Sequence, residues 1–337
     1  MKNLVLFTSK DRDSLTKVRN RESKFGEHIQ LIPNLTTTYD DIVNLDVDYV
    51  LFGIKEDIGI YANQGITGAY NAWQATIKIL LNTQYNLFNQ PKKVLVLGHL
   101  DYSMERKIVE EKATKKNITK ARRLVEAIDK DVTYMVATIV KAGKIPIIIG
   151  GGHNNAYGNI KGLSLAKNDK ANVVNLDAHT DFRDKEGRHS GNGFSYAYNE
   201  GYLKNYFVFG LHENYTSDKI FKTLTQLKCI KYNTYEALEV RNDIEFLSEL
   251  EIASQHVSNK PFGIEIDCDA IADIPSSAMT PSGFSVKKTR QFVHYFGKHK
   301  NASYLHICEA APTKKTASKV GKLISYLITD FIRAHDH

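Results

Sequence analysis

The chain alternates between short apolar runs and longer amphipathic stretches along most of its length. The runs are mostly β-branched or aromatic, and several stop at glycine; they occupy residues 49–53, 94–98, 146–150, 173–177, 206–210, 229–232, 262–267 and 304–308. A strand that is apolar at consecutive positions is buried on both faces, as in a parallel sheet covered by helices. The runs therefore predict about eight parallel strands.

The amphipathic stretches between these runs have the periodicity of helices. Residues 119–142 carry apolar side chains at near-helical spacing, and 247–256, 286–296 and 318–334 resemble them. Alternating strands and helices form right-handed βαβ units, so the pattern predicts an α/β fold with an open sheet between helices. Because no linker or repeat is visible, we expect one domain over residues 1–337, with 1–45 as an N-terminal extension of edge strand and loops.

Composition narrows the expected partners and compartment. The 337 residues include 42% hydrophobic and 25% charged residues, as in ordinary globular proteins, and the net charge is +7. The lysines are scattered, without zinc-finger spacing or basic–aromatic interleaving, so we expect a solvated basic surface and no nucleic-acid partner. No run reaches the ~18–20 apolar residues of a membrane span, and the N-terminus lacks a signal-peptide core. With three widely spaced cysteines, these features predict a cytoplasmic protein without a membrane partner.

Three of the predicted strands end in residues that can bind metal ions. The candidate ligands are His153, which follows three glycines, then Asp177, His179 and Asp181, and finally Asp267 and Asp269. In an extended chain, residues spaced by two point to the same face of the strand. In proteins with parallel sheets, bound molecules and ions lie beyond the carboxyl ends of the strands. The alternative is that the aspartates cap turns facing solvent and that the first histidine is structural.

The types of these residues indicate which ion would bind. Burying four aspartates and two histidines together is very costly without compensating positive charge. A carboxylate-rich set without thiolates suits a hard or borderline divalent ion, Mn²⁺ in preference to Zn²⁺. Six ligands are enough for two ions ~3.5–4 Å apart, which is an arrangement used in hydrolysis. We therefore predict two Mn²⁺ ions per chain, with other divalent ions as alternatives.

The three groups together resemble the signatures of a known enzyme family. In this order and at these separations, Gly150-Gly151-Gly152-His153, Asp177-Ala178-His179-Thr180-Asp181 and Asp267-Cys268-Asp269 resemble the arginase–agmatinase–formimidoylglutamase (ureohydrolase) family. The resemblance covers about residues 48–330. It implies a three-layer α/β/α sandwich with an eight-stranded parallel sheet, and hydrolysis of a C–N bond in a linear guanidino or formimino compound. It also implies that the more buried ion is held by His153, Asp177, Asp181 and Asp267, and the second ion by Asp177, His179, Asp267 and Asp269.

The resemblance also implies which residues act on the substrate. Residues 305–312 are similar to the last strand of the family, whose glutamate holds the cationic guanidino or amidino group; this makes Glu309 the substrate anchor. Asp181 would accept a proton during catalysis. The alternative for Glu309 is an ordinary surface glutamate after a strand.

A loop after the second motif supplies three further candidates. Residues 189–194 resemble a loop that carries a proton-shuttling histidine in arginases, which suggests His189 as the acid and Asn192 as a substrate contact. If the alignment is shifted by one residue, His189 is only a neighbour of the acid. Arg183 resembles the end of a D-L-R motif and would bind a substrate carboxylate or, as an alternative, form a structural salt bridge.

Details of the motifs favour formimidoylglutamases within the family. The glycine-rich motif and the residues after it resemble G-G-G-H-E-x-A-Y-G of formimidoylglutamases, whereas arginases and agmatinases favour G-G-D-H-S. Two departures are Asn154, where that subfamily usually has glutamate, and Glu265, where serine or cysteine is common. An additional acid at position 265 could tune the metal ions or reshape the substrate end of the site.

The resulting functional prediction is hydrolysis of N-formimidoyl-L-glutamate to L-glutamate and formamide, a reaction of histidine catabolism. One alternative is an arginase- or agmatinase-type hydrolase that releases urea. An alternative of another class is a catalytically decayed metal-binding protein. The expected partner is a small-molecule substrate, and a homo-oligomer is compatible with the family.

Overall fold

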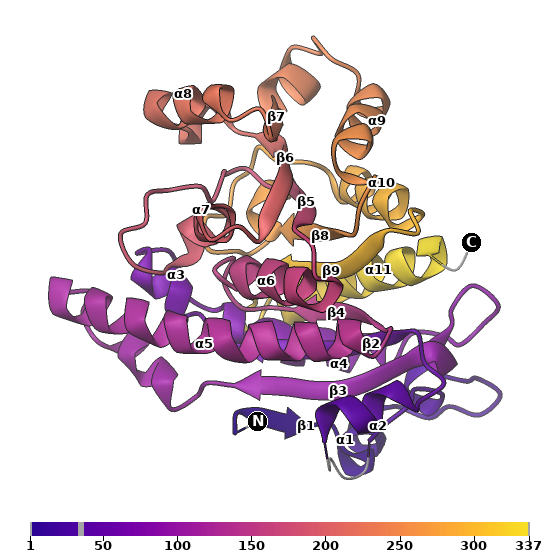
Figure 1. Ribbon diagram of the computed structural model, residues 1–337. Helices are drawn as coiled ribbons and strands as arrows, with labels where there is room; N and C mark the ends of the chain where they lie inside the picture. The colour runs from indigo at the N-terminus through magenta and orange to yellow at the C-terminus, as the bar shows by residue number, and fades with distance from the viewer. Residues whose placement is uncertain (1, 33–36, 336–337) are drawn as a thin grey trace.

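The computed structural model describes residues 2–32 and 37–335; residues 1, 33–36 and 336–337 lie outside the described part. Within the described residues, nine strands form one sheet in the order β1-β3-β2-β4-β9-β8-β5-β6-β7 (Figure 1). Eight of them are parallel, namely β2 (Tyr49–Lys55), β3 (Val94–Asp101), β4 (Ile145–Ile149), β5 (Ala171–Leu176), β6 (Leu203–Leu211), β7 (Ile230–Thr234), β8 (Phe262–Asp267) and β9 (Ala302–Cys308). The prediction of about eight parallel strands is confirmed. The ninth, β1 (Leu4–Leu6), is an antiparallel edge strand beside β3, in the segment where an edge strand was expected.

Helices cover both faces of this sheet and make it the middle of three layers (Figure 1). One face carries α2 (Thr38–Val43), α3 (Ile58–Ala62), α5 (Lys115–Lys141), α6 (Asn155–Lys167), α7 (Gly193–Asn199) and α8 (Asp218–Gln226). The other face carries α1 (Ser9–Leu15), α4 (Ala72–Leu80), α9 (Phe246–Val257), α10 (Val286–Gly297) and α11 (Ala317–His335). The four helices predicted from periodicity are α5, α9, α10 and α11. None of the described helices is both long and apolar enough to cross a membrane.

Two separate hydrophobic cores explain why the strands are apolar at consecutive positions. In β2, Leu51 packs in the core beneath α4 and α11, whereas Val50 and Phe52 pack in the core beneath α5 and α6. In β6, Phe207 and Phe209 face the first core. Successive side chains of a strand point to opposite faces, so a strand covered on both faces must be apolar at every position.

The strand order places the predicted metal-binding residues together. The strands that precede His153, Asp177, Asp267 and Glu309 are β4, β5, β8 and β9, which are neighbours in the spatial order β4-β9-β8-β5. Because all four run parallel, their carboxyl ends meet at one edge of the sheet.

Candidate metal centre

The turn after β4 brings His153 to this edge. Gly150 and Gly151 have φ angles of 83° and 75°, in the left-handed region that favours glycine. The buried Glu56, directly after β2, accepts a hydrogen bond of 2.9 Å from the backbone N–H of Gly152. The chain then enters α6 at Asn155. The imidazole of His153 is therefore held by a short, fully buried turn between a strand and a helix.

Asp177 and Asp267 are presented by the ends of β5 and β8 in the same way. In each, Oδ1 accepts a hydrogen bond of 2.7 Å from the backbone N–H two residues later, that of His179 or Asp269. The second oxygen, Oδ2, faces His153 in both cases. The i, i+2 spacing therefore leaves one oxygen of each carboxylate directed into a shared centre.

Four predicted ligands converge on this centre. Nδ1 of His153 lies 2.8 Å from Oδ2 of Asp181, 3.0 Å from Oδ2 of Asp267 and 3.2 Å from Oδ2 of Asp177. The ligand atoms of all four residues lie within 4.8 Å of one another, and all four residues are buried. One ring nitrogen has at most one proton to donate, so it cannot satisfy three carboxylate oxygens, whereas a divalent cation between them can. The donor set thus fits a carboxylate-rich Mn²⁺ site.

The electrostatics of the residues also favour a bound cation. Burial, together with the charges of Asp177 and Asp269, raises the pKa of Asp267 well above its usual value. Although burial opposes the protonated form of His179, Asp177, Asp269 and Asp181 raise its pKa to about 10. Asp267 is thus hard to ionise beside its neighbours, and His179 gains positive charge among them, which is the behaviour expected of a site built around positive charge.

The predicted second set is less closely gathered than the first. Nδ1 of His179 lies 3.5 Å from Oδ1 of Asp177, and Asp269 borders the same cavity. The carboxylate of Asp269 accepts hydrogen bonds from the Ser277 hydroxyl at 3.0 Å and from the Ala278 N–H at 2.9 Å. Nevertheless all six predicted ligands occupy one region at the edge of the sheet, and His179 is the most exposed of them, with 30% of its side chain accessible.

A cavity of about 490 Å³ opens onto these residues. Its wall includes His179, Asp181, Asp267, Asp269 and Glu309 from the strand ends, and Asn63, Gly65, Arg183, Ser190, Gly191, Tyr215, Thr216, Ser217 and Ser277 from loops. Tyr215, Thr216 and Ser217, in the segment after β6, contribute to this wall. A small polar molecule can therefore reach the predicted ligands from solvent.

Glu309 presents an unpaired acceptor to this cavity. It directly follows β9 with a φ of 61°, and its Oε1 accepts a hydrogen bond of 2.5 Å from the His153 N–H. Its Oε2 is buried and has no hydrogen-bond partner among the described residues. Burial, Asp267 and Asp269 raise the pKa of Glu309 well above its usual value. A cationic, hydrogen-bonding group in the cavity would satisfy both the charge and the open acceptor.

Arg183 lies at the mouth of the cavity and already has partners. Its Nη1 donates to Oδ1 of Asn63 at 2.7 Å, and its Nη2 donates to Oε1 of Glu186 at 3.1 Å. The side chain is half exposed. Arg183 thus forms the ion pair of the structural interpretation and also borders the cavity, and binding of a substrate carboxylate stays a prediction.

The predicted acid His189 is enclosed by its own loop. Its Nδ1 accepts a hydrogen bond of 3.1 Å from Gly191 N–H, which places the proton on Nε2, 3.1 Å from Oε1 of Glu186. Burial, Arg183 and Arg122 lower the pKa of His189 to about 4. The ring is therefore neutral near pH 7, and both nitrogens are engaged within the loop.

The side chain of Asn192 is likewise hydrogen-bonded within this loop. Its Oδ1 accepts hydrogen bonds from Nη1 of Arg188 at 2.5 Å and from His189 N–H at 3.1 Å. Ser190 and Gly191, rather than His189 or Asn192, are the members of this loop that border the cavity in the described part of the chain. The predicted loop is at the site, but the two predicted side chains point into its interior.

Sequence reasoning did not identify several residues that shape the site. Glu56 supports the glycine turn, and its position directly after β2 follows the same strand-end rule as the other acids. Ser277 holds Asp269, and Tyr215 stacks on His179 with ring centroids 5.7 Å apart. Ser277 comes from a loop without periodicity, so no pattern in the sequence indicated it, whereas Tyr215 ends the short helix Glu213–Tyr215 that follows β6.

Comparison with known proteins identifies the family. The Arginase family model matches residues 47–332. Formimidoylglutamases of Streptococcus pyogenes and Streptococcus gordonii are each 25% identical to the chain, over 83% and 86% of it and 84% and 86% of their own lengths. Among solved structures, formiminoglutamase of Trypanosoma cruzi with Mn²⁺ has a TM-score of 0.73 at 19% identity, covering 93% of this chain and 98% of that one. Formimidoylglutamase of Bacillus subtilis has a TM-score of 0.73 at 15% identity, covering 95% and 94%. These matches, with the nine-stranded fold and the converging ligands, show that the chain belongs to the arginase family.

Proposed function

We propose that this chain is a hydrolase with two divalent metal ions that cleaves N-formimidoyl-L-glutamate to L-glutamate and formamide. The observation that carries the proposal is the convergence of Nδ1 of His153 with three aspartate oxygens beside the open acceptor of Glu309. The cluster around His153 fits a divalent cation, and the free oxygen of Glu309 fits a cationic amidine in the adjoining cavity. The names of the similar streptococcal, trypanosomal and bacillar proteins support the choice of substrate.

His153, Asp177, Asp181 and Asp267 would hold the more buried ion, and Asp177, His179, Asp267 and Asp269 the other. Mn²⁺ is the proposed metal because the ligands are mainly carboxylates. When bound, the pair supplies a hydroxide near neutral pH by lowering the pKa of a water molecule.

The residues of the chain direct this nucleophile to one carbon atom. Glu309 binds the planar amidinium group and holds its central carbon above the strand ends, so that attack occurs at a fixed position. Asp181 accepts the proton released as the tetrahedral carbon forms. Asp181 passes this proton to the glutamate nitrogen as its C–N bond breaks, so that glutamate leaves as the free amine and the remaining carbon leaves as formamide.

The mouth of the cavity favours a substrate that carries a carboxylate. The guanidinium of Arg183 borders the cavity and is the kind of group that binds carboxylates through two hydrogen bonds. N-Formimidoyl-L-glutamate and arginine both have a carboxylate, whereas agmatine does not. Arginine therefore remains the second candidate substrate, with urea and ornithine as its products.

The test is a substrate panel with the full chain loaded with Mn²⁺. N-Formimidoyl-L-glutamate, arginine and agmatine are compared by formamide and urea release, and metal content is measured on the same sample. We expect formamide release from the first substrate and about two Mn²⁺ per chain. Release of urea from arginine or agmatine, without formamide release from N-formimidoyl-L-glutamate, would show that the substrate is a guanidino compound. Less than one Mn²⁺ per chain with no turnover would indicate a decayed site.

A further inference from the structure

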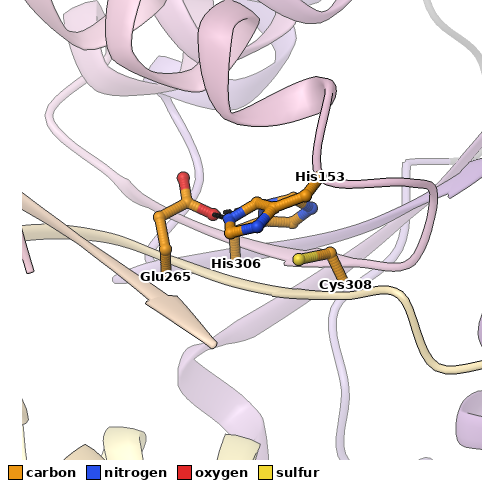
Figure 2. A group of neighbouring side chains, drawn as sticks. All are labelled: His153, Glu265, His306 and Cys308. Atoms are coloured by element: carbon orange, nitrogen blue, oxygen red, sulfur yellow. Dashed lines mark hydrogen bonds and ion pairs between the residues drawn. The ribbon is translucent and has the colours of Figure 1, made fainter. Parts of the chain in front are cut away.

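A second buried group of polar side chains lies at the other nitrogen of the His153 ring. Figure 2 shows His153 beside Glu265, His306 and Cys308, which come from β8 and β9. All four residues are buried, and their potential ligand atoms lie within 4.8 Å of one another. Whereas Nδ1 of His153 faces the aspartates, its Nε2 faces Oε2 of Glu265 at 3.5 Å. One imidazole thus connects the metal-binding cluster to this second group.

Glu265 is held in place through both of its oxygens. Its Oε2 accepts a hydrogen bond of 2.5 Å from Nδ1 of His306, and its Oε1 accepts one of 2.8 Å from the Tyr304 hydroxyl (Figure 2 shows the former). Glu265 and His306 are direct neighbours in the register of β8 and β9. Nε2 of His306 lies 3.2 Å from the carbonyl oxygen of Gly150, in the turn that carries His153. The group therefore joins two strands to the turn before the metal ligand.

These contacts argue against a third metal site in the group. Nδ1 of His306 is turned to Glu265 and its Nε2 to the Gly150 carbonyl, so neither nitrogen is directed at a common centre. Sγ of Cys308 lies 3.6 Å from the carbonyl oxygen of Ile266, where it acts as a donor. The group is a chain of hydrogen bonds rather than a set of free lone pairs.

Glu265 keeps hydrogen-bonding capacity for a further donor. Each carboxylate oxygen can accept more than one hydrogen bond, and Oε2, which takes one from Nδ1 of His306, is also the oxygen that faces His153. Glu265 is thus an acceptor held in place directly behind a predicted metal ligand.

The tautomer of His153 gives this acceptor a role. To bind an ion through Nδ1, the ring must carry its proton on Nε2, because a neutral imidazole has one donor and one acceptor. Nε2 has no hydrogen-bond partner of ordinary geometry among the described residues, and 3.5 Å is the outer limit of such a bond. A ligating histidine usually donates its other N–H to a carboxylate, carbonyl or water, which fixes its tautomer and strengthens the ligand.

We propose that Glu265 is a positioning residue that accepts a hydrogen bond from the Nε2–H of His153 and selectively increases the affinity of the more buried ion. The inference rests on the proposed two-ion centre. The second ion, with His179 and Asp269, depends on Glu265 only through the two shared aspartates. Substitution at Glu265 therefore affects the two ions unequally.

The experiment measures Mn²⁺ binding to the metal-free full chain by titration calorimetry. The variant Glu265→Gln keeps the size of the side chain and removes its charge. The matched control is Tyr304→Phe, which removes the hydrogen bond to Oε1 of Glu265 but leaves Oε2 facing His153. We expect about 10- to 100-fold weaker binding at one of two sites in Glu265→Gln. The other site, and both sites of Tyr304→Phe, should stay within about threefold of the original protein, well below that range.

Anomalous scattering at the manganese edge from crystals at limiting Mn²⁺ identifies the weakened site. Reduced occupancy beside His153 with retained occupancy beside His179 supports the proposal. Equal loss at both sites, or no loss at either, overturns it. If the original chain itself binds less than one Mn²⁺, the proposed metal centre has failed, which is distinct from two tight sites that ignore the substitution.

A second measurement does not depend on the folding of Glu265→Gln. Long-range ¹⁵N–¹H spectra of histidine-labelled protein, loaded with diamagnetic Zn²⁺, report which ring nitrogen carries the proton, and His153→Asn assigns the signal. A protonated Nε2 with a downfield proton typical of a carboxylate partner supports the proposal. A proton on Nδ1, or an Nε2 proton exchanging freely with solvent, overturns it.

Discussion

The floor and the mouth of the cavity are built by different parts of the fold. The floor consists of residues at the ends of β4, β5, β8 and β9, whose side chains are nearly all buried. The mouth consists of loops, in which charged side chains such as Arg183 and Glu186 are about half exposed and paired with one another. The sheet fixes the floor, because its strands are hydrogen-bonded in one register. The mouth is fixed only by local contacts.

This difference separates chemistry from substrate choice. Buried charges in the floor interact strongly and cannot be rearranged without loss of the site. Exposed ion pairs at the mouth are worth ~0–1 kcal/mol, so they can be replaced with small changes in stability. Substitutions in the floor should therefore abolish the reaction, and substitutions at the mouth should change which compound is hydrolysed and how tightly it binds.

The largest effect is expected for Asp267→Asn. Asp267 belongs to both predicted ligand sets, and an amide is a much weaker metal ligand than a carboxylate. We expect kcat/KM to fall by ~10³-fold or more, with a lower Mn²⁺ content by elemental analysis. The control is Asp243→Asn, an exposed aspartate paired with Arg241, which should keep both values. Full activity in Asp267→Asn would remove this residue from the centre.

The next effect is expected for Glu309→Gln, which separates the substrate anchor from the metal ligands. The amide still accepts the hydrogen bond from His153 N–H, but it lacks the charge that holds an amidinium group. We expect kcat/KM to fall ~10²–10³-fold, the range for loss of one charge-stabilising group in an active site. Mn²⁺ content should not change. A parallel loss of metal would make Glu309 a ligand instead of an anchor.

The floor was also the part that the sequence allowed us to predict. Each of its acids follows a continuous apolar run, so the strand and the site are indicated by the same stretch of sequence. The chain order β4, β5, β8, β9 differs from the spatial order β4-β9-β8-β5, and only the structure shows that the four strands are adjacent. The resemblance to the family supplied the expected ligands of each ion, but the distances between them required coordinates.

The helix α6 shows why some elements were not predicted. Gly158 and Gly162 interrupt its apolar pattern because α5 packs closely against it: a Cβ atom at either position would lie 2.8 Å from a side-chain atom of Val132 or Val136. Residues that allow close packing are not hydrophobic, so periodicity does not detect them. Similarly, His189 and Asn192 were selected by motif position, which does not show which way a side chain points within a loop.

A smaller effect is expected for Arg183→Gln at the mouth. If Arg183 binds a substrate carboxylate, its loss should raise KM for N-formimidoyl-L-glutamate about tenfold and change kcat little, because a charged hydrogen bond contributes ~1.5–3 kcal/mol and this one is partly exposed. The matched control is Lys185→Gln, which removes the same charge from an exposed neighbour in the loop. An unchanged KM in Arg183→Gln would show that Arg183 does not bind the substrate carboxylate and has only a structural role, in the ion pair with Glu186.

The smallest effect on the reaction is expected for His189→Asn, because the ring is enclosed by its loop and does not border the cavity. We expect kcat/KM near pH 8 to change much less than the ~10²-fold or more that a general acid contributes. The variant should differ instead in acid stability. The pKa of His189 is about 4 in the folded protein, below the ordinary 6.5. Between these two pH values the unfolded chain therefore binds a proton at His189 that the folded chain does not bind.

The stabilising contribution of neutral His189 is therefore complete above pH 6.5 and declines as the pH falls towards 4. Urea unfolding at pH 7.5 and pH 5 should show that the original protein loses up to about 2 kcal/mol more than His189→Asn over this interval. A large loss of kcat/KM in a variant of unchanged stability would contradict this assignment. It would place a proton-transferring residue in the mouth, so that the separation between chemistry in the floor and selection at the mouth would no longer hold.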